Sequence, residues 1–474
     1  MPENQDLVVI GAGPGGYTAA FLAADRGLNV TIVDELARPG GVCLHHGCMP
    51  SKALLHIAKV LTDARESGPC GIDFGVPSID LARLRQWKSD VVSKLTGGLG
   101  QLSKQRNVNY VQGRAAFDDA HTLTVSCLTS DGQPQRLTFD HAIVATGSRP
   151  LKPTELELDD ARVFDSTSAL ELETIPGSML VIGGGYIGLE LGTVYAALGC
   201  AVTIVEMSNS LLLGADPDLV RVVAKRISSL VEDVHLETTV TDLSASTDGI
   251  DVTFQPSEDA SRMKRFERVL VAVGRTPNSH LSGLGKTRVA IDSCGFISTD
   301  AQCRTAETSI FAIGDVAGEP MLAHKAFHEA RVAVDVICGG SSSFEPLAIP
   351  AVVFTDPEVA WCGLTETRAA ELGRPVLIAK FPWGASGRAL TLNRPEGLTK
   401  LVLDRETQQL LGVGIVGVGA GELIAEGVAA VEMGMTVSDL SSAIHPHPTL
   451  SETLGEAADL FLGQSAHVYR PRKP

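Results

Sequence analysis

A strand–glycine turn–helix–strand unit occurs twice in this 474-residue chain, and the repeat constrains the fold more than any other feature. In the first unit, an apolar run at 7–10 leads into G-x-G-x-x-G at 11–16, a helical segment, and a second apolar run that ends at Asp34. The second unit has its glycine turn at 183–188 and ends at Glu206. Each acid lies 23 positions after the first glycine of its unit. Two such units predict two α/β domains built on parallel sheets.

Each unit carries the residue types that bind a dinucleotide. Glycines let the backbone approach a pyrophosphate at the start of a helix, and the acid accepts hydrogen bonds from a ribose. A single motif of this kind also occurs in turns that bind no ligand, but two copies with equal spacing favour two sites. The predicted contacts are Gly11, Gly13, Gly16 and Asp34 in the first unit and Gly183, Gly185, Gly188 and Glu206 in the second.

The acid of the second unit also predicts which dinucleotide binds there. A carboxylate at Glu206 would repel a 2′-phosphate, and residues 207–210 contain no arginine or lysine that could accommodate one. The second site is therefore expected to prefer NAD over NADP.

Two of the nine cysteines, Cys43 and Cys48, lie five positions apart and just before Lys52. On an ideal helix, Cα atoms at that spacing are roughly 8.7 Å apart, whereas a disulfide needs about 4.4–6.8 Å. If the two sulfurs bond, this turn cannot be a regular helix, and Gly47 and Pro50 favour a distortion. Because strained disulfides are easier to reduce, we interpret the pair as a working redox disulfide.

Two other interpretations of this stretch are less favourable. His45 and His46 lie between the cysteines, so four potential zinc ligands fall within six consecutive residues. Four ligands so close in sequence rarely fit one tetrahedron, and no second cluster accompanies them, so we predict no metal. Two inert core thiols would also explain the cysteines alone, but not the motifs around them.

The composition excludes several kinds of partner. A formal net charge of −17 argues against nucleic acids and anionic membranes, because both require a basic face. No run reaches the roughly 18 apolar residues of a membrane span, and residues 1–6 carry acids rather than a targeting signal. Apart from Cys43 and Cys48 the cysteines are scattered, which is typical of a reducing compartment, so we expect a cytoplasmic protein.

The rest of the chain is expected to join these units into larger domains. Asp315, at the end of a strand, could accept hydrogen bonds from cofactor hydroxyls or could simply cap the next helix. The further predicted elements are a helix at 79–106, a small meander to about 140, crossing strands at 142–148 and 269–275, a strand at 309–315, a helix from 321, a linker at 339–343, and a final strand-and-helix domain of about 125 residues.

Near the C-terminus, His447 lies between Pro446 and Pro448, which hold it in an extended segment. A general base must be positioned, and this segment would position one. Glu452 has two possible roles. It could orient His447, or it could complete a capping box by bonding back to Thr449.

Taken in order, the two units, C-x4-C, the Gly-Asp turn and His-Pro-Thr-Leu-Ser-Glu at 447–452 resemble the dihydrolipoamide dehydrogenase family of flavin disulfide reductases. The resemblance covers essentially the whole chain. It implies an α/β fold with two Rossmann-like domains, one for FAD and one for NAD, and a C-terminal α+β dimerisation domain that makes a homodimer. The implied boundaries are 1–149 for the FAD-binding domain, 150–276 for the NAD-binding domain, 277–349 for the return to the FAD-binding part, and 350–474 for the interface domain.

The resemblance also assigns roles to individual residues. It implies that Cys43 exchanges with substrate, that Cys48 faces the flavin, and that Lys52 lies near the flavin with Glu190 as its partner. It implies that His447 and Glu452 form an acid–base dyad that reaches the disulfide of the other subunit. Further implied FAD contacts are Ala115, Thr146, Gly147, Ser148, Asp315, Met321, Leu322, Ala323 and His324, and further NAD contacts are Glu190, Val240 and Gly274.

The implied reaction is oxidation of protein-bound dihydrolipoamide with reduction of NAD⁺. No lipoyl domain precedes the first strand, so the substrate is expected on a partner, either the lipoyl-bearing acyltransferase of a 2-oxo-acid dehydrogenase complex or a glycine-cleavage carrier.

Two other disulfide reductases fit the sequence less well. Mercuric reductase would carry a C-terminal cysteine pair, whereas the last cysteine here is Cys362. Glutathione reductase would use NADPH, which Glu206 disfavours. A non-catalytic FAD-binding scaffold is the alternative from another class. The departures from the family are His45 and His46, where many members have Asn and Val, and Asp34, where many have Glu.

Overall fold

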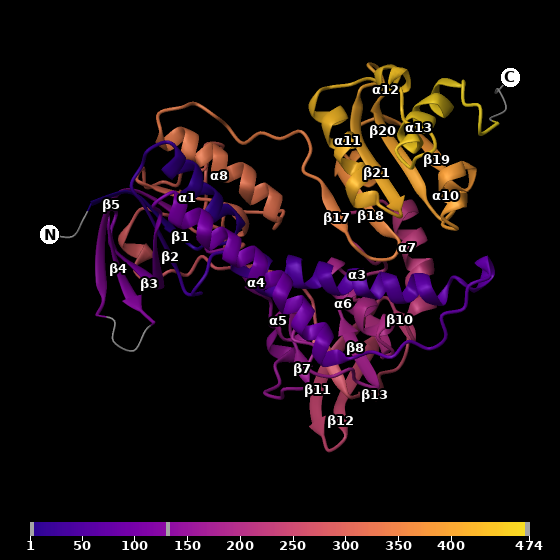
Figure 1. Ribbon diagram of the computed structural model, residues 1–474, viewed down its shortest axis with the longest axis horizontal. Helices are drawn as coiled ribbons and strands as arrows, with labels where there is room; N and C mark the ends of the chain where they lie inside the picture. Colours follow the sequence, from indigo (N-terminus) through magenta and orange to yellow (C-terminus); the bar gives the residue numbers. More distant parts are fainter. Residues whose placement is uncertain (1–3, 129–132, 470–474) are drawn as a thin grey trace.

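The computed structural model describes residues 4–128 and 133–469. It consists of three parts, each built on its own sheet, and two long helices, α3 (Cys48–Arg65) and α4 (Leu81–Gln105), extend from the first part towards the others (Figure 1). α4 confirms the helix predicted at 79–106. Among the described residues, no helix is both long and apolar enough to cross a membrane.

Parallel pairing in the first sheet brings the first glycine turn and Asp34 to the same edge. β1 (Asn4–Ile10) lies between β2 (Val30–Asp34) and β5 (Gln135–Val144), parallel to both. The second half of β1 and most of β2 are apolar and buried because helices cover the sheet: α1 (Pro14–Asp25) and α8 (Ala323–Ile337) share one hydrophobic core with β1 and β2. The carboxyl ends of these strands therefore face the turn that opens α1.

The remaining strands of this sheet come from distant parts of the sequence. β3 (Asn109–Asp119) and β4 (Thr122–Cys127) form the predicted meander with the first half of β5. The structure differs from the prediction in one respect: the meander's last strand and the strand predicted at 142–148 are one continuous β5, because its second half continues into the parallel sheet. β16 (Ile310–Ala312), predicted at 309–315, pairs parallel with β5.

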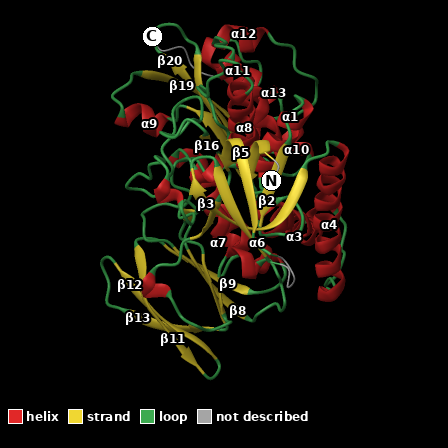
Figure 2. Ribbon diagram, turned by 90° about the vertical axis from the view of Figure 1, so that its left-hand side faces the viewer, coloured by secondary structure: helices red, strands yellow, loops and turns green. Residues whose placement is uncertain are grey.

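The second part repeats this design on a smaller scale. β8 (Ser178–Ile182) lies between β9 (Ala201–Val205) and β14 (Arg268–Val271), and α6 (Tyr186–Ala197) follows its glycine turn. The other strands of this part are β7 (Val163–Phe164) and β10 (Asp233–His235) at the sheet edges, and the antiparallel β11 (Thr238–Ser246), β12 (Gly249–Pro256) and β13 (Arg262–Phe266), which project at the lower left of Figure 2.

The crossing strands predicted at 142–148 and 269–275 fall mainly in β5 and β14, and the short segments that follow them pair with each other. β6 (Ser148–Pro150) and β15 (Arg275–Pro277) pair antiparallel, so the chain leaves and re-enters the first part through one small sheet. Further helices are α2 (Gly41–His46), α5 (Ser166–Ala169), α7 (Pro217–Leu230), α9 (Glu366–Glu371), α10 (Gly387–Thr391) and α12 (Val437–Ser442).

The third part is an antiparallel sheet covered by α11 (Ala420–Glu432) and α13 (Glu452–Leu462). Its strands, in sheet order, are β17 (Ala351–Val353), β18 (Glu358–Gly363), β21 (Leu410–Gly417), β20 (Leu398–Asp404) and β19 (Val376–Pro382). One hydrophobic core joins this part to the second part and to α3, through Leu54 of α3, Leu189 of α6 and Val416 of β21. The three parts therefore pack as one body around the N-terminal half of α3.

Two glycines of α6 provide a matched test of this packing. A Cβ at Gly188 would lie 2.1 Å from the carbonyl oxygen of Gly183, whereas a Cβ at Gly192 would meet only side-chain carbons at 3.6 Å or more. We expect Gly188→Ala to lower the free energy of unfolding by about 1–3 kcal/mol, because a backbone oxygen cannot move aside. Gly192→Ala should raise it by up to about 1 kcal/mol, since alanine favours helix. Urea midpoints measure both, and equal midpoints would contradict the expected close contact.

Candidate active site

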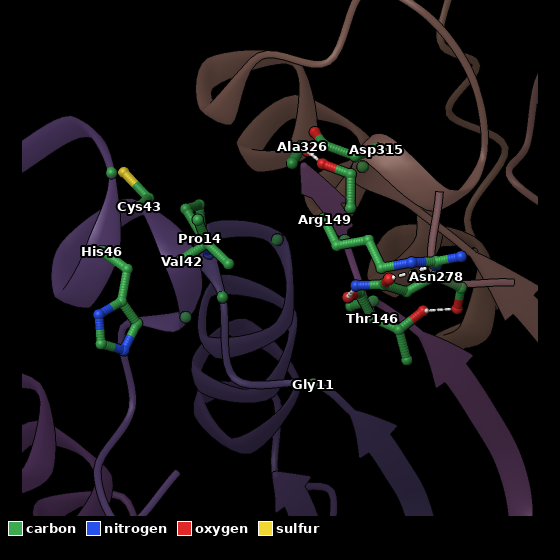
Figure 3. A pocket seen from close by; sticks show the side chains of 18 of the residues that line it. Gly11, Pro14, Val42, Cys43, His46, Thr146, Arg149, Asn278, Asp315 and Ala326 are labelled. Atoms are coloured by element: carbon green, nitrogen blue, oxygen red, sulfur yellow. Dashed lines mark hydrogen bonds between the residues drawn. The ribbon is translucent and has the colours of Figure 1, made fainter. Parts of the chain in front are cut away.

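A cavity of about 790 Å³ lies at the carboxyl edge of the first sheet and extends to the start of α6 (Figure 3). The nucleotide turn, the end of β2, the two cysteines and the start of α8 all line it. The predicted residues that line it are Gly11, Gly13, Asp34, Cys43, Cys48, Lys52, Ala115, Thr146, Gly147, Ser148, Glu190, Asp315, Met321 and Ala323.

The two cysteines lie on either side of a helix break. α2 ends at His46, Gly47 has φ −148° and ψ −110°, and α3 begins at Cys48. A Cβ at Gly47 would lie 3.0 Å from the carbonyl oxygen of Val42, so glycine suits this close turn. The prediction that the turn between Cys43 and Cys48 is not a regular helix is confirmed.

The pair is electrostatically asymmetric in its dithiol form. The hydrogen bond from the Cys43 thiol, helped by the charge of Lys52, lowers the pKa of Cys48 to about 7 even though burial opposes this. The same hydrogen bond, together with burial, raises the pKa of Cys43. The reduced pair therefore carries its proton on Cys43 and its negative charge on Cys48, and thiolates are the reactive form of cysteine.

Lys52 is held by a mostly buried ion pair. Its Nζ lies 2.7 Å from Oε2 of Glu190, whose side chain is 4% exposed. The other carboxylate oxygen of Glu190 accepts a hydrogen bond from the backbone N–H of Phe354 at 3.0 Å. The predicted partnership of Lys52 and Glu190 is present in the structure, and it places the lysine charge beside the cysteines.

The acids of the two nucleotide units also brace the glycine turns. Asp34 Oδ2 accepts the N–H of Ala12 at 2.6 Å, and Glu206 Oε2 accepts the N–H of Gly184 at 2.7 Å. Burial raises the pKa of Asp34, and its hydrogen bonds from backbone N–H groups counteract that rise. Each carboxylate oxygen has further lone pairs, so bracing leaves room for a ribose hydroxyl.

The cavity fits FAD. Gly11 has φ +102°, and a Cβ there would lie 2.3 Å from the carbonyl oxygen of Ala145, so only glycine allows this turn. α1 begins at Pro14 with no side-chain cap, which leaves its first N–H groups for a pyrophosphate. Asp34 lies beside this turn, where it would meet a ribose, and Cys48 lines the same cavity. The volume is also within the range of ligand pockets.

A polar network that sequence reasoning missed completes the cavity wall. Ser148 Oγ donates to Asp315 Oδ2 at 2.5 Å, and Arg275 Nε donates to Ser148 Oγ at 2.7 Å. Thr146 Oγ1 donates to the carbonyl oxygen of Asn278 at 2.8 Å (Figure 3). Asp315 is thus held by a side chain and does not cap a helix. Arg275 begins β15 and Asn278 directly follows it, and their position at the end of the second predicted crossing strand was the available signal.

Other predicted contacts lie away from the cavity. Among the residues of the Met321–His324 run, Leu322 and His324 do not line it; His324 Nε2 lies 2.7 Å from the carbonyl oxygen of Pro350, and α8 begins only at Ala323. Gly16 packs beneath the turn, where a Cβ would lie 1.8 Å from the carbonyl oxygen of Gly11.

The second glycine turn has the same strained geometry as the first. Gly183 has φ +112°, and a Cβ there would lie 2.3 Å from the carbonyl oxygen of Ala272. Gly185 precedes α6, Gly274 has φ +136°, and Val240 is buried beside this sheet. The helix that this turn opens borders the FAD cavity through Tyr186 and Glu190. The second nucleotide site is thus adjacent to the first.

The two histidines between the cysteines are separately placed. His45 Nε2 lies 3.2 Å from the carbonyl oxygen of Arg38, whereas His46 lines the cavity and burial lowers its pKa. In the part of the chain that the structure describes, no group of three or more histidine, cysteine, aspartate or glutamate side chains could hold a metal ion.

Glu452 combines both of its predicted roles. Its Oε1 lies 2.8 Å from His447 Nδ1, and its Oε2 accepts the N–H of Thr449 at 2.7 Å. The capping box is incomplete, because Ser451 precedes the helix and the Thr449 hydroxyl donates to Pro446 instead. These hydrogen bonds, from Thr449 first, lower the pKa of Glu452 against the effect of burial, so it remains a carboxylate. The His447 side chain is 75% exposed and does not line the cavity of its own chain.

Comparison with known proteins agrees with this geometry. Residues 5–330 match the family model for pyridine nucleotide-disulphide oxidoreductases, and residues 349–458 match the dimerisation domain of these enzymes. The dihydrolipoyl dehydrogenase of Haemophilus influenzae is 47% identical over 457 residues, which covers 96% of this chain and 95% of the relative. That of Vibrio cholerae is 46% identical over 459 residues with the same coverage.

Among solved structures, the Cu(II) complex of the HOCl-induced flavoprotein disulfide reductase RclA from Escherichia coli has a TM-score of 0.85 at 27% identity, covering 97% of this chain and 99% of RclA. This chain belongs to the pyridine nucleotide-disulphide oxidoreductase family. Within that family it groups with the dihydrolipoyl dehydrogenases, which it matches over nearly their full length.

The asymmetry of the thiol pair can be tested through Lys52. In the reduced holoenzyme, alkylation of Cys48 by iodoacetamide should rise with pH around a midpoint of about 7, because only the thiolate reacts. Lys52→Met removes a charge that favours the thiolate, so the midpoint should move to higher pH. Lys52→Arg keeps the charge and should stay near the original midpoint. Peptide mass spectrometry follows each cysteine, and an unmoved midpoint in Lys52→Met would contradict the assignment.

Proposed function

We propose that this protein is a dihydrolipoyl dehydrogenase, which oxidises a dihydrolipoyl dithiol to the cyclic disulfide and reduces NAD⁺, with bound FAD between the two. The observation that carries the proposal is the hydrogen-bonded pair of Cys43 and Cys48 beside Lys52, in the cavity of a glycine turn that fits FAD. The curated relatives have the same activity in their names.

The first step of the proposed mechanism is a thiol–disulfide exchange on the oxidised pair. His447 accepts a proton at Nε2 from one substrate thiol; its Nδ1 is held by Glu452, which fixes the orientation of the ring. The substrate thiolate attacks Sγ of Cys43, and Cys48 leaves as a thiolate. Lys52 favours that leaving group, because its charge lowers the pKa of Cys48.

The second exchange completes oxidation of the substrate. The other substrate thiol loses its proton and attacks the substrate sulfur that is bonded to Cys43, which closes the cyclic disulfide and releases Cys43. Cys43 takes one proton and Cys48 keeps the negative charge, so the enzyme gains two electrons and one proton, and the second proton passes to solvent. FAD, when bound, carries the electron pair from the thiols to NAD⁺.

The residues that would hold FAD are those of the cavity, with Asp34 at the ribose and the start of α1 at the pyrophosphate. Glu206 would hold the adenine-side ribose of NAD⁺ in the second unit. Tyr186 and Glu190 line the FAD cavity and belong to α6, the helix that the second glycine turn opens.

The proposal includes a homodimer in which His447 serves the Cys43 of the other subunit. The match of residues 349–458 to a dimerisation domain supports this, and so does the position of His447, which is exposed and outside its own cavity. The dithiol would arrive on the acyltransferase of a 2-oxo-acid dehydrogenase complex or on a glycine-cleavage carrier. Exposed free thiols at Cys70, Cys294 and Cys338 support a reducing cytoplasm.

The function is tested by steady-state turnover of the purified holoenzyme with dihydrolipoamide. NAD⁺ should be reduced, and NADP⁺ should be reduced far more slowly because Glu206 repels a 2′-phosphate. Cys48→Ser should abolish turnover while FAD stays bound. A holoenzyme that binds FAD but leaves NAD⁺ oxidised would instead indicate the scaffold alternative.

The base is tested by His447→Gln, which keeps a similar shape but cannot accept the proton. Dihydrolipoamide turnover should fall by about 10²–10⁴-fold. Reduction of bound FAD by NADH should keep its rate, because that half-reaction does not use His447. Unchanged dihydrolipoamide turnover would exclude His447 as the base.

A further inference from the structure

A second histidine–glutamate pair lies two residues before the proposed base. His445 Nε2 is 2.7 Å from Oε1 of Glu426, which belongs to α11. His445 Nδ1 is 3.1 Å from the carbonyl oxygen of Ala443. His445 and His447 therefore share one short segment and the same kind of partner, but their rings are bonded differently.

The hydrogen bonds of His445 engage both of its ring nitrogens. Nε2 lies against the Glu426 carboxylate and Nδ1 against the carbonyl oxygen of Ala443. His447, by contrast, is held at Nδ1 alone. His445 thus has no free ring nitrogen to face a substrate thiol, and its pairing with Glu426 needs another explanation.

The position of His445 supplies that explanation. We call residues 443–448 the His447 segment. Within it the side chain of Ile444 is almost wholly exposed and that of His447 is 75% exposed, whereas that of His445 is 11% exposed. Its ring lies against α13, where a Cβ at Gly455 would come within 3.0 Å of His445 Nδ1. His445 is thus the one histidine of the segment that is anchored between α11 and α13.

The opposite end of the segment is anchored separately. Thr449 donates its hydroxyl to the carbonyl oxygen of Pro446 and its N–H to Glu452, which also holds His447. An exposed base has few neighbours to restrain it, so its backbone must be fixed from both sides. The Glu452 contacts fix the C-terminal side, and the pair of His445 and Glu426 fixes the N-terminal side.

We propose that His445, held by Glu426, is a positioning residue for the dithiol half-reaction: it sets where His447 lies relative to the thiol that it deprotonates. The inference rests on the proposed role of His447 as the base. Misplacement of a catalytic group by about 1 Å can reduce the rate on the order of 10²-fold. Loss of the anchor should therefore lower kcat and leave substrate binding nearly unchanged.

The test uses the holoenzyme with dihydrolipoamide and NAD⁺. In His445→Gln, kcat should fall about 10- to 100-fold with little change in KM, and reduction of bound FAD by NADH should keep its rate. In a His447→Gln background, His445→Gln should have no further effect, because a positioning residue acts only through the residue it positions. Tm and dimer content are measured in parallel.

The matched control is His467→Gln. His467 Nδ1 lies 2.6 Å from Glu456 of α13, so this variant breaks another histidine–glutamate pair, and it should keep wild-type kcat. Gly455→Ala should also displace His445, because the added methyl group would press on its ring. This variant should lower kcat in the dithiol half-reaction. It replaces His445→Gln in the test if that variant does not dimerise.

Either of two results would overturn the proposal. The first is wild-type kcat in a folded, dimeric His445→Gln or Gly455→Ala variant. The second is that His445→Gln lowers kcat by the same factor in the His447→Gln background as in the wild-type enzyme. If His447 is not the base, His447→Gln alone would keep wild-type turnover, and this result distinguishes the two failures.

Discussion

The ion pair between Lys52 and Glu190 is the contact on which the arrangement around the thiols depends. Lys52 lies one turn after Cys48 on α3, Glu190 lies on α6, and the second oxygen of Glu190 binds the backbone N–H of Phe354 next to β17. A buried carboxylate without its cation would be strongly unfavourable. One carboxylate therefore ties the cysteine helix to the second and third parts, and any shift of α3 would break it.

The chemical difference between two identical side chains follows from that placement. The break at Gly47 brings the thiols within hydrogen-bonding reach, and α3 begins at Cys48 while Cys43 lies on α2. The hydrogen bond and the charge of Lys52 then favour the thiolate at Cys48 and the thiol at Cys43. The family resemblance implies that one cysteine faces the substrate and the other faces the flavin. The local geometry is consistent with these roles, because the two cysteines differ in their positions and not in residue type.

The elements that depend on a local sequence pattern could be predicted, whereas side-chain contacts between distant segments could not. The nucleotide units, α4 and the break near Gly47 are confirmed because glycine spacing and apolar periodicity act within a few residues. The bond of Ser148 to Asp315 joins residues 167 positions apart, and Arg275 approaches Ser148 from a third segment. No local pattern specifies such a meeting. The ring of His324 likewise lies 2.7 Å from the carbonyl oxygen of Pro350, a contact that no local pattern predicts.

The placement of the proposed base has a structural cause. The cavity of each chain is already walled by residues of the first and second parts, and its described lining contains no histidine–carboxylate pair beside Cys43. In the proposed mechanism the base approaches from outside, and the side chain of His447 is exposed. An exposed side chain can contact another subunit, but it lacks the packing that normally holds a side chain in place. Each freely rotating bond also carries conformational entropy that must be lost in the reactive geometry. Prolines on both sides of His447 and the His445 ring held by Glu426 two residues earlier restrict that freedom before the substrate arrives. Catalysis by an exposed residue therefore requires an unusually well-anchored backbone.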